Sequence, residues 1–271
     1  MIDSKIQDEL RERFNFDGSL LRNHQQRLLE MLKYFDGLCK AHGITYWLSS
    51  GTLIGAVRHG GFIPWDDDVD VEMLRDDYNK LVRVFESEPN PKFILQTHKS
   101  DYYYFAPFAK LRDRNSVIKE MNTNVDLYYK YRGVFIDIFI MEPSSSRLIA
   151  RGASVLHNLL LLHPMSYIKN SIIRPIYYCI VFFLLYKIVI PVLRLITCVG
   201  TKERLRHTVG CSFIKERFRG EIFPVQKILF EDIYVPVPNK YDCYLRRIYG
   251  NYMKLPKIES IETHTADLIL K

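Results

Sequence analysis

Cysteine is scarce in this chain. The five cysteines among 271 residues are widely spaced and odd in number, and no Cys-x-x-Cys pair occurs. This pattern argues against a disulfide scaffold and against a thiolate zinc site. The N-terminus, Met1 to Lys5, also lacks the charged and then apolar pattern of a signal peptide. We therefore expect a cytoplasmic protein.

Acidic residues are nearly missing from residues 143–220. This segment holds 12 Lys and Arg against two acids, Glu203 and Glu216, which gives a net charge of +10. The remainder therefore carries −3 of the chain's +7. The same segment is the most apolar part of the chain. A basic and apolar segment favours a membrane surface, and not nucleic acid, as the partner.

Long uninterrupted apolar runs are also missing. Within Ile172–Val199 the longest such run, Ile176–Tyr186, has 11 residues, whereas a spanning helix needs about 20. Lys187, Pro191 and Arg194 interrupt the remainder of this stretch. We expect a re-entrant or interfacial pair of helices, peripheral on the inner face of the membrane, with the twelve cations near anionic lipid. A true span, a buried hairpin and an oligomer face stay open as alternatives.

Hydrophobic periodicity alternates between helix and strand through residue 142 and again after residue 220. Helices are predicted at 20–42, 53–59, 75–85, 147–162, 172–199 and 241–249, and strands at 44–48, 69–73, 93–97, 106–111, 133–140 and 230–237. The pattern predicts an α+β fold, a mixed sheet flanked by helices. We divide the chain into a catalytic core (1–142), a basic, apolar helical insertion (143–220) and a C-terminal part that completes the core (221–271).

An acidic run precedes and enters one of these strands. Residues two apart in a strand share a face, so Asp68 and Asp70 are expected to point the same way while Val69 enters the core. Two adjacent carboxylates repel each other unless a cation lies between them. Oxygen ligands suit Mg²⁺ or Mn²⁺. Asp66, on the same side but before the regular strand, is a third ligand or a supporting group.

Asp137 is the one polar side chain from Val134 to Met141. A carboxylate in such a strand needs a partner when buried. If this strand pairs beside the first, Asp137 joins Asp68 and Asp70 to form a one-metal or two-metal platform for phosphoryl transfer. Two alternatives stay open. The acidic run is a solvated surface, or Asp137 pairs with a buried arginine.

The loop upstream of the acidic run carries small residues, Ser49-Ser50-Gly51-Thr52, before a short helix, where backbone N–H groups can hold a phosphate. From Tyr46 to Val71 the chain reads YWLSSGTLIGAVRHGGFIPWDDDVDV. This stretch resembles the core motif of the LicD family, which includes bacterial phosphocholine transferases and fukutin-type ribitol-phosphate transferases. Two further blocks agree, at 108–139 and 230–252, so the resemblance covers residues 24–142 and 221–256.

The resemblance implies a nucleotidyltransferase-like fold and transfer of a phospho-alcohol, most simply phosphocholine, from a CDP donor to a hydroxyl of a cell-surface or lipid-linked glycan. It implies metal binding by Asp68, Asp70 and Asp137 with support from Asp66. Candidates for contacts to the nucleotide and its phosphates are Ser50, Gly51, Thr52, Arg58, Lys110 and Arg112. A choline-type cation needs aromatic faces, for which the candidates are Trp47, Trp65 and Tyr103.

Two other functions are compatible with the same residues. One is a nucleotidylyltransferase that leaves the nucleotide on a sugar acceptor. The other is an inactive membrane-associated scaffold that binds glycan, which three mutually repelling acids argue against. His59, His98 and Glu231 are candidates for a general base, each with a structural role as its alternative. The sequence names neither the transferred group nor the acceptor.

Overall fold

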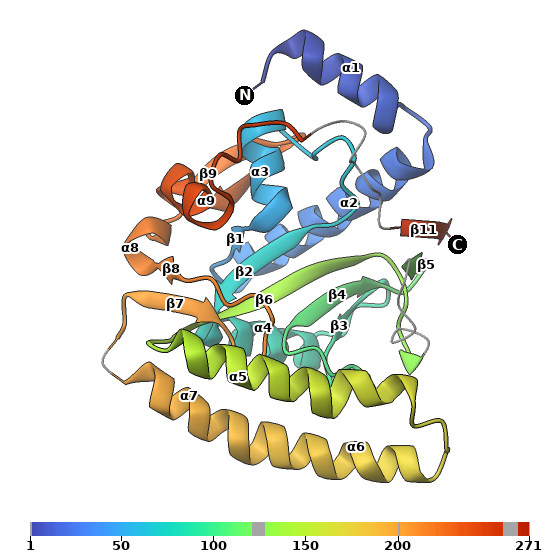
Figure 1. The fold of residues 1–271 in the computed structure, drawn as a ribbon. Coiled ribbons are helices and arrows are strands. Elements are labelled where there is room, and N and C mark those ends of the chain that lie inside the picture. Colours follow the sequence, from blue (N-terminus) through green and yellow to red (C-terminus); the bar gives the residue numbers. More distant parts are fainter. Residues whose placement is uncertain (1, 121–127, 200, 257–264, 271) are drawn as a thin grey trace.

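A computed structural model describes residues 2–120, 128–199, 201–256 and 265–270 (Figure 1). The main sheet has the strand order β1-β2-β6-β4-β3, and β7 pairs with β6 and β8. β2 and β6 run parallel, whereas the other pairs in this sheet are antiparallel. The predicted α+β class, a mixed sheet flanked by helices, is confirmed.

In the described ranges the helices are α1 Ser4–Phe14, α2 Leu20–Ala41, α3 Ser50–His59, α4 Arg75–Ser87, α5 Arg147–His157, α6 Ile173–Phe183, α7 Ile190–Cys198, α8 Arg219–Ile222 and α9 Tyr241–Tyr249. Wider helical turns extend α5 through Asn158–Leu162 and join α6 to α7 through Leu184–Val189. The strands are β1 Trp47–Leu48, β2 Asp70–Leu74, β3 Phe93–Gln96, β4 Ala109–Asp113, β5 Ser116–Glu120, β6 Phe135–Pro143, β7 Arg204–His207, β8 Arg217–Phe218, β9 Gln226–Phe230, β10 Ile233–Val237 and β11 Thr265–Leu270.

The predicted helices at 20–42 and 241–249 match α2 and α9 closely, because both have a clear apolar stripe and a stop signal, Gly43 and Gly250. One strand boundary matters more for the site. β2 begins at Asp70, and Asp68 lies in the irregular segment before it. The expectation that strand alternation fixes Asp68 is therefore wrong.

The main core lies between the sheet and α2, and it extends to α9. Leu28, Leu32 and Phe35 on α2 are fully buried, as are Val71 and Ile138 on the central strands. The central strands are thus covered by apolar side chains on this face, while Asp70 and Glu72 of β2 lie on the other face. The parallel β2–β6 pair lies in the middle of the sheet.

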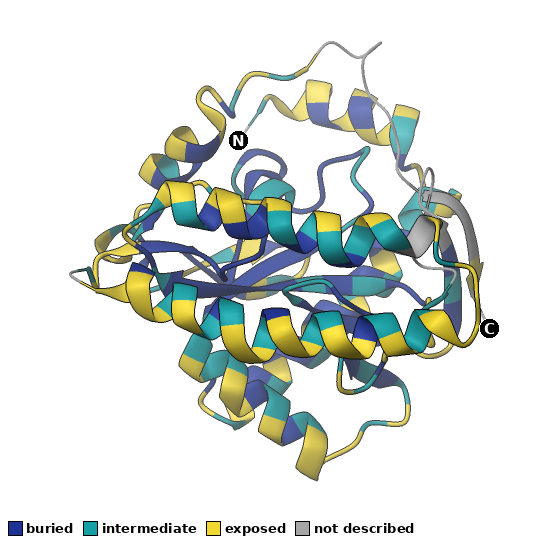
Figure 2. Ribbon diagram, turned by 60° about the horizontal axis from the view of Figure 1, so that its bottom comes forward, coloured by how far each residue is buried: buried dark blue, intermediate teal, exposed yellow. Residues whose placement is uncertain are grey.

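The insertion forms two long helices that lie side by side against the sheet, α5 and the continuous α6–α7 helix (Figure 1). They pack through a second, smaller core that includes Phe105, Leu161, Tyr178 and Leu185. The helix Ile173–Cys198 has 26 residues and is apolar and long enough to cross a membrane. Only 11% of its most apolar 18-residue stretch is buried inside the protein. Exposed positions recur along it (Figure 2). The buried-hairpin alternative is therefore wrong.

The basic residues of 143–220 do not all face outward. Arg206 and Arg217 are buried, and they pair with Glu216 at 2.9 Å and with Glu72 at 2.9 Å. β7 and β8, which lie in this segment, belong to the main sheet. The expectation that all twelve cations lie near lipid is wrong, because some of them neutralise acids of the catalytic core.

Candidate active site

Two carboxylates meet at the start of the parallel strands. Asp70 on β2 and Asp137 on β6 are register partners, and the Asp137 N–H donates to the carbonyl of Val69 at 2.8 Å. Burial raises the pKa of Asp70, and the charges of Asp68 and Asp137 raise it further. Buried carboxylates that repel one another in this way favour a cation bound between them.

Asp66 and Asp68 join the cluster from the segment before β2. Burial, Asp68 and Asp67 raise the pKa of Asp66, which places Asp66 and Asp68 within electrostatic reach of each other. The Asp66 carboxylate lies over Gly51, where a Cβ atom would come within 2.7 Å of its Oδ2. Asp67 is buried, and its charge acts on both Asp66 and His24 of α2. The acidic run thus forms one electrostatic group.

The small-residue loop supports Asp70 directly. The Thr52 hydroxyl, which is buried, accepts a hydrogen bond from the Asp70 N–H at 2.8 Å. The Ser50 side chain hydrogen-bonds the Asp70 carboxyl and also Tyr249 of α9. Ser50 adopts φ 50°, in the left-handed region. The loop thus reaches the predicted site, and its two hydroxyl groups position Asp70.

The three cationic candidates lie in different surroundings. Lys110 Nζ is 3.1 Å from Asp137 Oδ1 and 3.2 Å from the centre of the Phe135 ring. Arg112 is buried and donates to Gln96 Oε1 at 2.8 Å and to the carbonyl of Gly133 at 2.7 Å. Lys110 therefore lies at the carboxylate cluster. Arg112 has a structural role, because its hydrogen bonds go to Gln96 and to the backbone of Gly133.

Arg58 is 5% exposed and donates to the carbonyl of Tyr252 at 2.6 Å. Its Nε also donates to His59 Nε2 at 2.8 Å. Burial lowers the pKa of Arg58, and Asp66 opposes that shift. Arg58 thus lies within electrostatic reach of the cluster, but its guanidinium anchors the C-terminal segment.

The aromatic candidates do not gather around the carboxylates. Trp47 is fully buried and donates from Nε1 to Glu72 at 2.9 Å, so its predicted role in binding a ligand cation is wrong. The Trp65 ring packs edge-on against Phe14 of α1, with 5.5 Å between ring centres. Tyr103 packs edge-on against Tyr178 of α6, with 6.2 Å between ring centres.

A cavity of about 240 Å³ adjoins Lys110 instead. Rings of Tyr104, Phe108 and Tyr129 line it together with Lys110 and Arg112. Its other wall comes from the insertion, through His157, Asn158 and residues 210–213. The signal for this cavity in the sequence is the Tyr102-Tyr103-Tyr104 run, in which Tyr104 and not the predicted Tyr103 is the lining residue.

Sequence reasoning missed Glu72, which follows Asp70 on the same face of β2. Glu72 is fully buried and lies 2.8 Å from His207 Nε2, 2.9 Å from an Arg217 nitrogen and 2.7 Å from the Tyr244 hydroxyl. Burial opposes its ionisation, but Arg217 and the hydrogen bonds outweigh burial and lower the pKa of Glu72 to about 2. Its partners lie far along the chain, so no local pattern could reveal them.

Asp70 and Asp137 on two central strands, and Asp66 and Asp68 before β2, thus form one carboxylate cluster beside a short helix that begins with small residues. The comparisons with known proteins identify the domain that carries this cluster. Residues 43–176 match the family model described as "LicD/FKTN/FKRP, nucleotidyltransferase domain". This part of the chain is a LicD-family domain.

Two relatives illustrate the breadth of the family. The chain is 39% identical over 132 residues to the lipopolysaccharide cholinephosphotransferase LicD of Haemophilus influenzae, a match that covers 48% of each protein. It is 48% identical over 50 residues to the human ribitol 5-phosphate transferase FKRP, which covers 18% of this chain and 10% of that protein. The chain therefore matches about half the length of the first relative and less of the second.

Proposed function

We propose that this protein transfers phosphocholine from CDP-choline to a hydroxyl of a cell-surface glycan of the lipopolysaccharide type. The observation that carries the proposal is the in-register pair Asp70 and Asp137 beside Asp66 and Asp68. The similarity to a lipopolysaccharide cholinephosphotransferase supports phosphocholine as the group transferred.

The reaction is an in-line displacement. The acceptor oxygen forms a bond to the phosphorus that carries choline, the bond from that phosphorus to the bridging oxygen breaks, and CMP leaves with the electron pair. The acceptor proton passes to a base or to solvent. Lys110, held beside Asp137, is suited to contact the diphosphate.

Asp68, Asp70 and Asp137 are the residues that would hold Mg²⁺ or Mn²⁺, with Asp66 in support. Their oxygen donors and mutual repulsion fit such an ion in kind. Within the described residues, however, no three of the His, Cys, Asp and Glu side chains already have metal-ligand spacing. Side-chain rotation would have to bring them together. A bound ion would neutralise charge on the diphosphate.

The cavity beside Lys110 is the proposed place for the choline group, because it is lined by aromatic rings and Lys110 connects it to Asp137. The apolar outer face of α6–α7 supports a position at the cytoplasmic surface of a membrane. The nucleotidyltransferase-like fold and the boundaries near residues 142 and 220 are part of the same proposal.

The direct test incubates the purified chain with CDP-choline, CDP-ribitol or CDP-glycerol, Mg²⁺ and a glycan acceptor, and measures CMP. We expect CMP release with CDP-choline and a large loss in Asp70→Asn. Asp8→Asn is the matched control, because Asp8 is an exposed residue of α1. Equal turnover in both variants, or transfer of the nucleotide itself, would contradict the proposal.

Metal binding has its own test. Mg²⁺ or Mn²⁺ should raise the melting temperature of the wild type by mass action. It should raise that of Asp8→Asn similarly and leave that of Asp70→Asn unchanged. An equal rise in all three proteins would place the ion elsewhere.

A further inference from the structure

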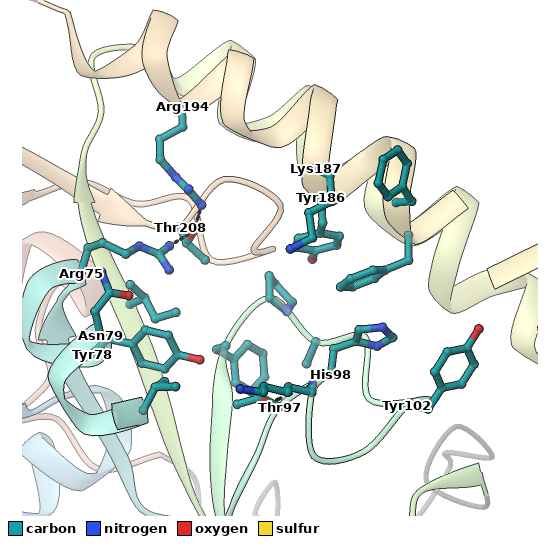
Figure 3. A pocket seen from close by; sticks show the side chains of 18 of the residues that line it. Arg75, Tyr78, Asn79, Thr97, His98, Tyr102, Tyr186, Lys187, Arg194 and Thr208 are labelled. Carbon is teal, nitrogen blue, oxygen red and sulfur yellow. Dashed lines mark hydrogen bonds between the residues drawn. The ribbon is translucent and has the colours of Figure 1, made fainter. Parts of the chain in front are cut away.

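A second and larger cavity lies on the other side of the 106–108 segment. It measures about 820 Å³ and is enclosed by α4, residues 97–108 and the α6–α7 helix (Figure 3). None of the four site carboxylates is among the described residues that line it. The proposed reaction therefore leaves this cavity without a role.

The cavity is basic and aromatic. Its five cationic side chains come from three parts of the chain, α4, the loop after β3 and the α6–α7 helix: Arg75, Arg83, Lys99, Lys187 and Arg194. In the part of the chain that the structure describes, no Asp or Glu lines it. Aromatic rings, among them Tyr78, His98 and Phe182, supply much of the remaining wall. Such a lining suits an anion that is attached to an apolar group.

Two arginines are fixed side by side at one end. Arg75 pairs with Glu142 Oε1, and Arg194 Nε is 2.8 Å from Glu142 Oε2. Thr208 Oγ1 accepts from Arg75 at 2.7 Å (Figure 3). One buried carboxylate thus holds two guanidinium groups and leaves a net positive charge. Burial lowers the pKa of Arg75 to about 10, and the charge of Arg194 contributes a smaller part of that shift.

The charged side chains of the helix Ile173–Cys198 all lie on the side that faces the rest of the protein. Arg194 and Lys187 line the cavity, and Arg174 lies 4.5 Å from the centre of the Tyr128 ring. The outer stripe, at helical spacing, is apolar and about half exposed: Ile176, Ile180, Leu184, Ile188 and Val192. Lys187 therefore does not interrupt that stripe, and the cavity opens beside a surface suited to lipid.

We propose that this cavity binds the phosphate head group of an anionic membrane lipid, whose acyl chains lie along the exposed face of α6–α7. Guanidinium pairs recognise phosphate oxygens through parallel N–H donors, and Lys187 adds a point charge. The apolar stripe supplies the surface that a free phosphate would not need. The assignment does not depend on the reaction at the carboxylates.

The test measures binding of the full-length chain to phosphatidylcholine vesicles with and without phosphatidic acid. The wild type should prefer vesicles that contain phosphatidic acid. Lys187→Leu should lose about five-fold or more of that preference, although it makes the helix more apolar. Lys202→Leu makes the same charge change outside the cavity and should keep most of the preference.

Three results would overturn the proposal. The first is tighter binding of Lys187→Leu to both vesicles with an unchanged preference, as expected of a lysine that merely interrupts an apolar face. Equal losses in Lys187→Leu and Lys202→Leu would show a diffuse surface attraction. Inorganic phosphate and soluble short-chain phosphatidic acid can each be added to compete with the vesicles. If inorganic phosphate displaces the chain from the vesicles as effectively as the short-chain lipid, the cavity binds a free anion. Asp70→Asn should retain vesicle binding, so failure of the proposed reaction is distinguishable.

Discussion

Replacing Glu72 with Gln should destabilise the fold strongly, although it removes no side-chain volume. Glu72 accepts from Trp47, His207, Arg217 and Tyr244, and so connects β1, β7, β8 and α9 to β2. Glutamine keeps one oxygen acceptor but removes the negative charge that neutralises Arg217, which is buried (3% exposed). An uncompensated buried charge costs about 3–5 kcal/mol.

The pKa of Glu72 gives an independent magnitude. Its fall from 4.5 to about 2 corresponds to about 3 kcal/mol of stabilisation at neutral pH. Because the pKa is lowered in the folded state, this contribution is present above pH 4.5 and is lost as the pH falls toward 2. The difference between wild type and Glu72→Gln should therefore shrink over that window.

Urea unfolding in a fixed detergent, followed by tryptophan fluorescence, provides the measurement. We expect the free energy of unfolding of Glu72→Gln at pH 7 to fall by about 3 kcal/mol. Arg217→Met should also destabilise, but the double variant should lose less than the sum of the two single losses. Additive losses, or a change below about 0.5 kcal/mol in Glu72→Gln, would refute the reasoning.

Two further substitutions probe the loop that supports Asp70. Thr52→Val leaves the Asp70 N–H without its acceptor, which should cost about 1–3 kcal/mol in urea unfolding, whereas Thr52→Ser should keep most of the stability. Gly51→Ala places a Cβ atom 2.7 Å from the Asp66 carboxylate and should lower CMP release about ten-fold or more. Gly37→Ala, where a Cβ atom meets nothing within 4 Å, should leave CMP release unchanged.

The central strands were predictable because their chemistry is local. Asp137 is conspicuous in an apolar strand, and its pairing beside Asp70 follows from one topological assumption that the register bears out. α2 was equally clear, since its apolar spacing runs for more than five turns. In both cases a local pattern carries the information that the fold uses.

The unpredicted parts depend on partners far apart in the sequence. Arg217 lies 145 positions from Glu72. From the neighbouring sequence alone, Arg217 is therefore taken as part of a basic surface. Trp47 could be a ligand contact or a core residue until its Nε1 partner is known. Thr52 stands in a small-residue loop that suggests phosphate, yet its hydroxyl accepts from the backbone of Asp70. Composition identifies such residues as polar but cannot name what they bind.

The parallel β2–β6 pair also fixes the distance between the carboxylate cluster and the basic cavity. Asp70 and Asp137 are register partners at one end, and Arg75 pairs with Glu142 just beyond the other. A strand rises about 3.3 Å per residue, so the Cα atoms of Asp70 and Leu74, the two ends of β2, lie about 13 Å apart, and Arg75 follows Leu74 directly. Buried strands in a hydrogen-bonded ladder do not change that separation by side-chain motion. The lipid phosphate proposed for the cavity and the diphosphate proposed for the carboxylates therefore occupy separate sites, at opposite ends of the same strand pair.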